Sequence, residues 1–430
     1  MLKPLSKSVV ILGANGTMGA GAAAVFAGAG YNVVMLARER DKAEAGLEAA
    51  KRAARADALG EFVRAGTYGA DLERECARAS VIFEALAEEI GLKREFFARV
   101  DRCRADDSLV ATNSSGLSIA EMARGRSDSF RRHFLGIHLY NPPHIIVGTE
   151  VIPNPDTAPE VLSAAVAMLR GQLNRKVIVT RDRPAFVGNR VGFKVMNEVA
   201  QLAEHYGVAF LDYVVGPQTG RAMAPLATID LVGWDVHKAI VDNVRANCRD
   251  EAYQCFTLPA YIERGVTAGS LGDKTPAMGG FYRREGKSVE VLNPATGGYE
   301  PYAAPEPIGF VERMREHNRM GRYGGAMAEL ASAEGPEAEL ARRVVMGYVS
   351  YALNRVGEVA ESTSDVDTIM SFGFNWAPPG AIVDLMGARR AVELCERAGL
   401  AVPPAVESAA RKGHKLFSGC VLDYGRTFFA

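Results

Sequence analysis

The sequence predicts an α/β domain with a doubly wound, mostly parallel sheet, followed by two all-helical domains. Three observations predict this fold class. Short runs rich in Val and Ile alternate with helical stretches up to about residue 180, as in a sheet whose strands are joined by helices. Beyond Pro184 the strand signals stop and a helical pattern takes over. One helical unit of this second part then occurs twice.

Seven strands are expected in the first part, each a short run of β-branched and other apolar residues. They are Ser8–Gly13, Asn32–Ala37, Val81–Glu84, Leu109–Thr112, Phe134–His138, Glu150–Ile152 and Val177–Thr180. Helical stretches separate most of them, so a largely parallel sheet is predicted. Because Pro184 follows the last strand, a domain boundary is predicted near residues 182–188.

The second part is expected to be helical. Asn189–Tyr206 carries apolar residues at the spacing of one helix face, namely Val191, Val195, Met196, Val199 and Leu202. Between residues 283 and 310, four prolines and a Gly-Gly pair predict an extended connection. The predicted domains are residues 1–183, 184–290 and 336–430, with residues 291–335 as a linker.

One helical unit is repeated in this second part. The run GRAMAPLATIDLVG at residues 220–233 returns as GFNWAPPGAIVDLMG at residues 373–387. Both copies share a Gly, an Ala-Pro pair, an Asp-Leu pair and a final Gly, which two unrelated Ala-rich and Gly-rich loops would rarely share. The repeat therefore predicts an internal duplication, in which a loop leads into a docked helix.

Composition and charge exclude several classes of function. Lys and Arg number 50 against 51 Asp and Glu, so the net charge is −1 and no global field attracts nucleic acid or an anionic membrane. Six cysteines form no C-x-x-C pair and seven histidines no H-x-x-x-H pair, so neither a disulfide framework nor a metal site is expected. No apolar run approaches the roughly 20 residues that span a bilayer. We expect a soluble, unprocessed cytoplasmic protein.

The first strand ends in a glycine turn, ANGTMGAG, which leads into a helix of small residues. Backbone N–H groups of such a turn and of the helix start can hold a pyrophosphate without a cationic side chain. Gly16 would let the phosphate approach and Gly19 would let helix and strand pack closely, although the turn is one residue longer than usual. The alternative is a turn that serves packing only. We predict a Rossmann-type dinucleotide site formed by Gly13, Asn15, Gly16, Thr17, Met18 and Gly19.

The second strand ends without the acidic residue that holds the ribose hydroxyls in NAD-specific sites. Ala37 is followed by Arg38, Glu39 and Arg40. The arginines could bind a 2′-phosphate through charge-assisted hydrogen bonds, which favours NADP, whereas Glu39 could still serve the ribose of NAD. A solvated helix start would look the same, so both cofactors stay open, with Arg38 as the residue that favours NADP.

One histidine has the setting of a general base. His138 lies at the end of a strand, and Glu150 follows 12 residues later, after a Pro-bounded loop. A strand that returns beside the first would bring the carboxylate to the imidazole, fix its tautomer and raise its basicity. That arrangement suits removal of a hydroxyl proton as hydride leaves. A structural histidine is the alternative, and the glycine turn favours catalysis.

Five motifs in order resemble the L-3-hydroxyacyl-CoA dehydrogenase family over nearly the whole chain. They are Thr112-Asn-Ser-Ser115, Gly136-Ile-His-Leu-Tyr-Asn-Pro142, Glu150-Val-Ile152, Pro184-Ala-Phe-Val-Gly-Asn-Arg190, and Asp273-Lys-Thr275 with Gly280-Phe-Tyr282. The duplicated unit resembles β-oxidation members with two C-terminal helical domains. The resemblance implies an oxidoreductase of fatty-acid metabolism that interconverts an L-3-hydroxyacyl-CoA and a 3-ketoacyl-CoA with NAD or NADP.

The resemblance also implies roles for single residues. It makes His138 the general base and Glu150 its partner, while Ser115 and Asn189 hold the substrate oxygen. Five further positions match cofactor contacts of the family: Glu88, Lys93, Asn113, Asn141 and Lys274. These roles agree with the chemistry that the residues suggest by themselves, because donors near the substrate oxygen stabilise charge that develops there.

Some features depart from the family pattern. The stretch between Arg38 and Val81, where the family contacts coenzyme A, is shorter than usual, and the Lys274 to Gly280 segment is longer. The acyl carrier therefore stays open. Two other functions are considered: another β-hydroxyacid dehydrogenase, which would usually need a catalytic lysine, and a non-catalytic dinucleotide-binding redox sensor. The two helical copies could pack on each other, so a monomer is predicted and a dimer is not excluded.

Overall fold

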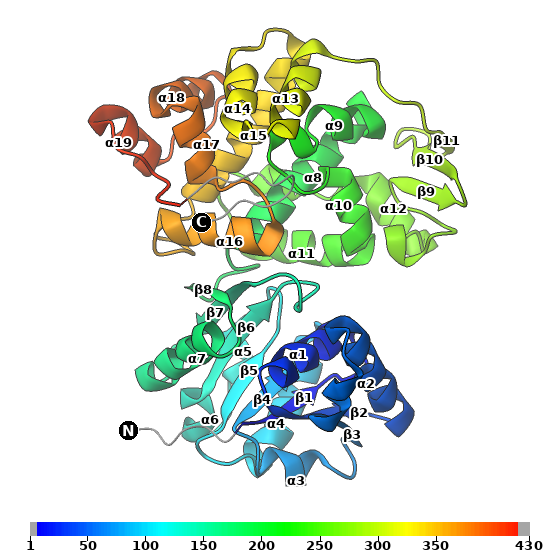
Figure 1. Cartoon of the computed structure of the whole chain (residues 1–430), viewed down its shortest axis with the longest axis vertical. Helices are drawn as coiled ribbons and strands as arrows, with labels where there is room; N and C mark the ends of the chain where they lie inside the picture. The colour runs from blue at the N-terminus through cyan, green and yellow to red at the C-terminus, as the bar shows by residue number, and fades with distance from the viewer. Residues whose placement is uncertain (1–6, 420–430) are drawn as a thin grey trace. The chain divides into compact units, whose positions relative to one another are not determined.

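The computed structural model describes residues 7–419 and divides into two compact units, Met1–Phe186 and Val187–Ala430 (Figure 1). The division falls after Phe186, within the range 182–188 predicted for the boundary. Within residues 7–419, no helix combines the length and the hydropathy needed to cross a bilayer.

The first unit is built on one eight-stranded sheet with the strand order β3-β2-β1-β4-β5-β6-β7-β8. Neighbouring strands pair in parallel, except that β7 runs antiparallel to β6. The strands are β1 (Ser8–Leu12), β2 (Asn32–Ala37), β3 (Val63–Thr67), β4 (Val81–Glu84), β5 (Leu109–Thr112), β6 (Phe134–Leu139), β7 (Gly148–Pro153) and β8 (Lys176–Val179). The predicted α/β class is confirmed.

Helices cover both faces of this sheet, as a doubly wound fold requires (Figure 1). One apolar layer lies under α1 (Thr17–Gly28), α2 (Arg40–Ala54) and α7 (Pro159–Gly171). The opposite layer lies under α3 (Leu72–Cys76), α4 (Ile90–Cys103), α5 (Ile119–Ala123) and α6 (Asp128–Arg132). Strand β3 was not predicted, because its sequence VRAGT carries an exposed Arg64 and a glycine instead of an apolar run.

The second unit is mainly helical and surrounds α8, Gly188–Tyr206. The predicted helix Asn189–Tyr206 is confirmed, but its burial is not limited to one face. Every residue from 188 to 200 is buried, and only Leu202 of the expected apolar face is half-buried. The other helices of eight or more residues are α10 (Pro225–Val232), α11 (Trp234–Asn247), α12 (Ala260–Ala268), α13 (Gly309–Arg319), α14 (Tyr323–Ser332), α15 (Pro336–Leu353), α16 (Thr363–Phe374), α17 (Pro379–Met386), α18 (Ala388–Arg397) and α19 (Pro404–Lys412), and the shorter α9 is Val208–Val214.

The expectation that strands end at Pro184 is wrong. A small antiparallel sheet of β9 (Tyr282–Glu285), β10 (Ser288–Leu292) and β11 (Tyr299–Pro301) follows α12. Its charged and half-exposed residues hid the apolar alternation that marks a strand. The expected linker 291–335 is folded as well, since it contains β11 and the helices α13 and α14, whose buried residues include Phe310 and Met314.

The internal duplication is visible in matching helices and hydrogen bonds. Helices α10 and α17 each begin with a proline and end at a glycine of positive φ. The Asp230 carboxylate of the first copy accepts two consecutive backbone N–H groups at residues 281–282, and Asp384 of the second accepts two at residues 416–417. The copies also contact each other, because the N–H of Ala377 donates to the carbonyl of Gly220 at 2.7 Å.

Candidate active site

The antiparallel pairing of β6 with β7 brings the predicted base and its partner together. His138 lies directly opposite Glu150 in the strand register, and Nδ1 of the imidazole is 2.7 Å from Oε2 of the carboxylate. Both side chains are buried, at 3% and 0% exposure. A carboxylate on Nδ1 favours the tautomer with its proton there, so the other ring nitrogen, Nε2, is left to act as a base.

Tyr140 is a third member of this group that the sequence did not single out. Its hydroxyl donates to Oε2 of Glu150 at 2.7 Å, and its ring lies 4.6 Å from the imidazole ring of His138, centre to centre. Burial and the Glu150 charge raise the pKa of Tyr140 well above its ordinary value, so it stays a donor. The available signal was its position, two residues after His138 and directly after the end of β6.

The glycine turn has the backbone that the sequence predicts for it. Gly13 has a φ of +96°, and a Cβ at this position would lie 2.2 Å from the carbonyl oxygen of Ala85. A Cβ on Gly19 would lie 2.2 Å from the oxygen of Gly13, so this glycine lets α1 pack against the turn. A Cβ on Gly16 would meet nothing closer than 3.6 Å. A side chain at Gly16 would thus meet only ordinary contacts, and the residue itself is exposed at the helix start.

The start of α1 has the exposure that anion binding needs. Asn15, Gly16 and Thr17 are exposed and Met18 is half-buried, and no side chain caps this helix start by a hydrogen bond. The first N–H groups of an uncapped helix and the helix dipole favour a negatively charged group. The residues present thus fit the pyrophosphate of a dinucleotide.

The carboxyl ends of β1, β4, β5 and β6 meet along one edge of the sheet. Asn113 ties two of them together, since its N–H donates to the carbonyl of Glu84 and its Oδ1 accepts the N–H of Leu139, both at 2.8 Å. The loop after β6 reaches α1, where a Cβ on Gly21 would lie 2.7 Å from Pro143. His138, the glycine turn and the exposed Asn141 thus lie along the same edge.

A buried ion pair occupies this edge. Nζ of Lys93, on α4, lies 2.7 and 3.0 Å from the two carboxylate oxygens of Glu84, and 3.3 Å from Glu88. Thr112 donates its hydroxyl to the same Glu84 carboxylate. The sequence pointed to Lys93 and Glu88 but not to Glu84. A carboxylate that ends an apolar strand is also expected at a strand end with no functional role.

The same group of charges holds the loop that carries Ser115. Oε1 of Glu88 accepts the hydroxyl of Ser114 at 2.6 Å and the backbone N–H of Ser115 at 2.8 Å. Ser115 itself is half-buried. The structure therefore brings Glu88, Lys93, Asn113 and Ser115 together at the carboxyl edge of the sheet.

The residues that follow β2, Arg38 to Arg40, are exposed, as a site for the adenosine ribose would be. Arg40 pairs with Glu44 at 3.0 Å, and Glu39 pairs with Lys42 at 3.3 Å, both along the surface of α2. Within residues 7–419, no ion pair engages Arg38. Its guanidinium is therefore available to an anionic ligand.

Asn189 and Lys274 belong to the second unit, and their roles stay predictions. Asn189 lies in the first turn of α8 and is buried, with 6% of its surface exposed. Lys274 is half-exposed, and its Nζ pairs with Asp235 at 2.7 Å.

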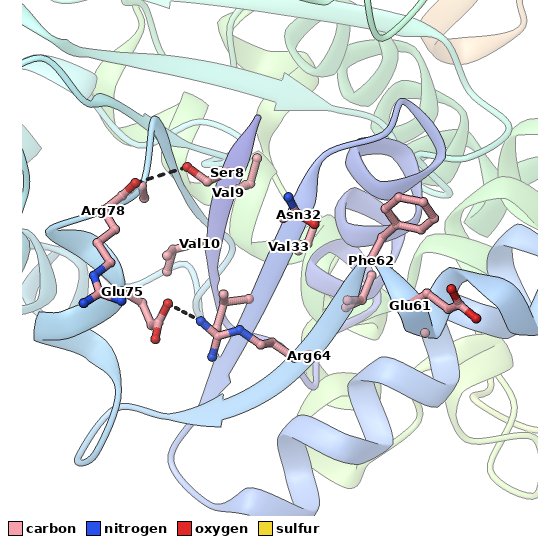
Figure 2. Close-up of a pocket in the computed structure, with 14 residues that line it drawn as sticks. Ser8, Val9, Val10, Asn32, Val33, Glu61, Phe62, Arg64, Glu75 and Arg78 are labelled. Atoms are coloured by element: carbon pink, nitrogen blue, oxygen red, sulfur yellow. Dashed lines mark hydrogen bonds and ion pairs between the residues drawn. The ribbon is translucent and has the colours of Figure 1, made fainter. Parts of the chain in front are cut away.

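A cavity of about 280 Å³ lies in the first unit, away from this edge (Figure 2). Ser8, Asn32, Arg64 and Arg78 are among its lining residues, and Arg64 forms an ion pair with Glu75, which also lines the cavity. It borders the amino ends of β1 and β2, whereas nucleotides bind at the carboxyl ends of parallel strands. None of the predicted site residues lines it. The cavity is therefore not the cofactor site.

Two family models match this chain. The NAD-binding domain of 3-hydroxyacyl-CoA dehydrogenase matches residues 8–183, and the C-terminal domain of the same family matches residues 186–284. A probable 3-hydroxyacyl-CoA dehydrogenase from Bacillus subtilis is 29% identical over 374 residues, which cover 85% of this chain and 46% of the relative. The chain thus spans about half the length of that protein.

Two further relatives extend the comparison. A probable 3-hydroxyacyl-CoA dehydrogenase from Deinococcus radiodurans is 32% identical over 292 residues, covering 65% of this chain and 83% of the relative. The crystal structure of 3-hydroxybutyryl-CoA dehydrogenase from Escherichia coli shares the fold, with a TM-score of 0.69 and 19% identity over 95% of this chain and 99% of that one. The chain carries an NAD-binding domain and belongs to the 3-hydroxyacyl-CoA dehydrogenase family.

Proposed function

We propose that this chain interconverts an L-3-hydroxyacyl-CoA and a 3-ketoacyl-CoA in fatty-acid oxidation, with a nicotinamide dinucleotide as the redox partner. The observation that carries the proposal is the buried pair of His138 and Glu150, on the same sheet edge as the glycine turn. The family supports it, because the first matched domain is the NAD-binding domain of 3-hydroxyacyl-CoA dehydrogenase and the second is the C-terminal domain of the same enzyme.

Each residue of the site has a definite part in this proposal. A nicotinamide dinucleotide held at the glycine turn would supply the hydride-transfer chemistry. His138 takes the hydroxyl proton at Nε2, because Nδ1 is held by Glu150. Glu150 keeps the ring oriented and stabilises the imidazolium that forms, while Tyr140 holds the carboxylate. Ser115 and Asn189 donate toward the substrate oxygen, where negative charge would otherwise build up.

The decisive test is turnover of acetoacetyl-CoA by the purified protein, followed by the loss of NADH or NADPH absorbance. We expect turnover that falls by roughly 10²–10⁴-fold in His138→Gln, with the affinity for NADH unchanged. A redox sensor would bind NADH equally well and show no turnover in either protein. Reduction of free acetoacetate at the same rate as its thioester would instead favour another β-hydroxyacid dehydrogenase.

We also propose that Arg38 lets the site accept NADPH. The proposal is supported by the exposed guanidinium of Arg38 at the end of β2, where family members hold the ribose with an acidic residue. Arg38→Asp should raise the Kd of NADPH at least tenfold and leave that of NADH within threefold. Equal affinities before and after the change would show that Arg38 does not read the 2′-phosphate.

The state of assembly and the location follow from the sequence only as predictions. The contact between the two helical copies supports a monomer, since it supplies within one chain the pairing expected between subunits. Analytical ultracentrifugation should give a single species of the chain's own mass, 46.2 kDa, and a concentration-dependent dimer would contradict it. A cytoplasmic location is proposed with it.

A further inference from the structure

The buried charges of the second unit form one connected network at the start of α8. Arg190, which follows the predicted substrate contact Asn189, is only 1% exposed. Its Nη2 lies 2.7 Å from Asp250 and 2.7 Å from Glu358, and its Nε donates to the hydroxyl of Tyr351 at 3.0 Å. The guanidinium is therefore held from three directions.

The groups around Arg190 also hold one another. The Tyr351 hydroxyl donates to Asp250 at 2.8 Å, and Arg355 lies 3.1 Å from the same carboxylate. Arg355 also binds Glu358. Burial favours the neutral form of Asp250, but the hydrogen bonds from Arg190 and Tyr351 outweigh it, and the pKa of Asp250 lies below its ordinary value. Its negative charge is thus maintained.

The network joins the two helical copies. Arg190 is on α8, and Asp250 follows α11, so both belong to the first copy. Tyr351 is on α15 of the second copy, and Glu358 lies in the loop of residues 354–362 that follows α15. In the first copy a single glycine, Gly207, separates α8 from α9, so this loop has no counterpart there. The second copy thus supplies two of the three groups on Arg190.

The backbone that leads into α8 is strained. The two residues that precede the cap, Ala185 and Phe186, have φ values of +61° and +51°. A non-glycine residue in the left-handed region costs about 1–2 kcal/mol. A guanidinium fixed by three partners restrains rotation of the turn about the helix axis, and so the direction of the neighbouring Asn189 side chain.

We propose that Arg190 is a positioning residue for Asn189, and that the second helical copy holds it through Tyr351 and Glu358. The inference rests on the proposed function, in which Asn189 donates to the substrate oxygen. A small displacement of a donor in an active site can cost a large factor in rate, since the reacting geometry must be held closely. Loss of one partner of Arg190 should therefore reduce kcat without weakening cofactor binding.

Two tyrosines of α15 provide a matched test. Tyr351→Phe removes a hydroxyl from the network, whereas Tyr348→Phe removes an equally buried hydroxyl that donates to the carbonyl of Ala377 at 2.8 Å. Both variants should lose stability. Only Tyr351→Phe should lower kcat for acetoacetyl-CoA reduction, on the order of tenfold, with KM and the Kd of NADH nearly unchanged. Glu358→Gln, at a half-exposed position, should also lower kcat.

A double-mutant cycle with Asn189→Ala then decides between positioning and general stability. If Arg190 acts through Asn189, Tyr351→Phe has no further effect on kcat once Asn189 is alanine. A tenfold loss of kcat in both backgrounds, or equal losses of kcat in the two tyrosine variants, overturns the inference. Full activity of Asn189→Ala also overturns it. A wild-type protein that binds NADH but reduces no acetoacetyl-CoA refutes the proposed function itself, which is a separate result.

Discussion

Replacement of Asp367 by asparagine should make the protein more stable at alkaline pH. Asp367, on α16, is 1% exposed, and its Oδ1 accepts the backbone N–H of Gly380 at 2.8 Å. Within residues 7–419, its Oδ2 has no hydrogen-bond partner. Burial raises the pKa of Asp367 to about 7, although the hydrogen bond from Gly380 opposes the rise.

The size of the stability change follows from the difference between the pKa of Asp367 in the folded state and its pKa in the unfolded state. Because the pKa is higher in the folded state, the folded protein holds the proton more tightly, and stability falls as the pH rises from the unfolded value toward 7. Each pH unit of this range is worth about 1.4 kcal/mol, so about 3 kcal/mol is lost between pH 5 and pH 8. Asparagine does not titrate and keeps the oxygen that accepts the Gly380 N–H.

Urea denaturation of both proteins at several pH values measures this difference. The free energy of unfolding of Asp367→Asn minus that of wild type should grow by about 3 kcal/mol from pH 5 to pH 8 and level off above it. Asp212→Asn is the control, since burial raises the pKa of Asp212 only to about 6, and the growth should be near 1 kcal/mol. A difference that does not change with pH would show that Asp367 is charged throughout.

Three further predictions concern the site. Tyr140→Phe should lower kcat/KM by roughly three- to tenfold, because Glu150 keeps its histidine but loses one donor, and an unchanged steady-state rate would contradict this. Glu84→Gln should reduce the free energy of unfolding by about 3 kcal/mol in urea, since the buried Lys93 loses its nearest carboxylate and keeps only the half-exposed Glu88 as a charge partner. Gly19→Ala should weaken NADH binding in a fluorescence titration, while Gly69→Ala, with open space around it, should not.

Much of the first unit could be predicted because most of its strands are apolar runs, including β8 at one edge of the sheet. Strand β3, at the other edge, escaped because Arg64 faces solvent there and Gly66 interrupts the apolar run. The three strands after α12 escaped for the same reason, since a small sheet with exposed residues needs no apolar run. A helix or strand can be predicted from its local sequence only where it buries enough surface to require a pattern of apolar residues.

Some residues of the candidate site could also be predicted from the sequence, and others could not. Gly13, Gly19 and His138 stood out because a turn, a close approach and a strand end each require a particular residue type. Tyr140 and Glu84 did not, because their importance arises from partners that only the folded chain brings near. A side chain whose role is to bind another side chain need not lie at a fixed sequence spacing from it, so no sequence pattern predicts it.

The duplication gives this chain a freedom that a pair of identical subunits lacks. In a symmetric dimer any substitution is made twice, so neither half can specialise alone. Here the second copy carries a loop with Arg355 and Glu358 that the first copy does not have. One half of the helical unit can thus hold Arg190 in place, while the other carries Arg190 itself and the neighbouring Asn189.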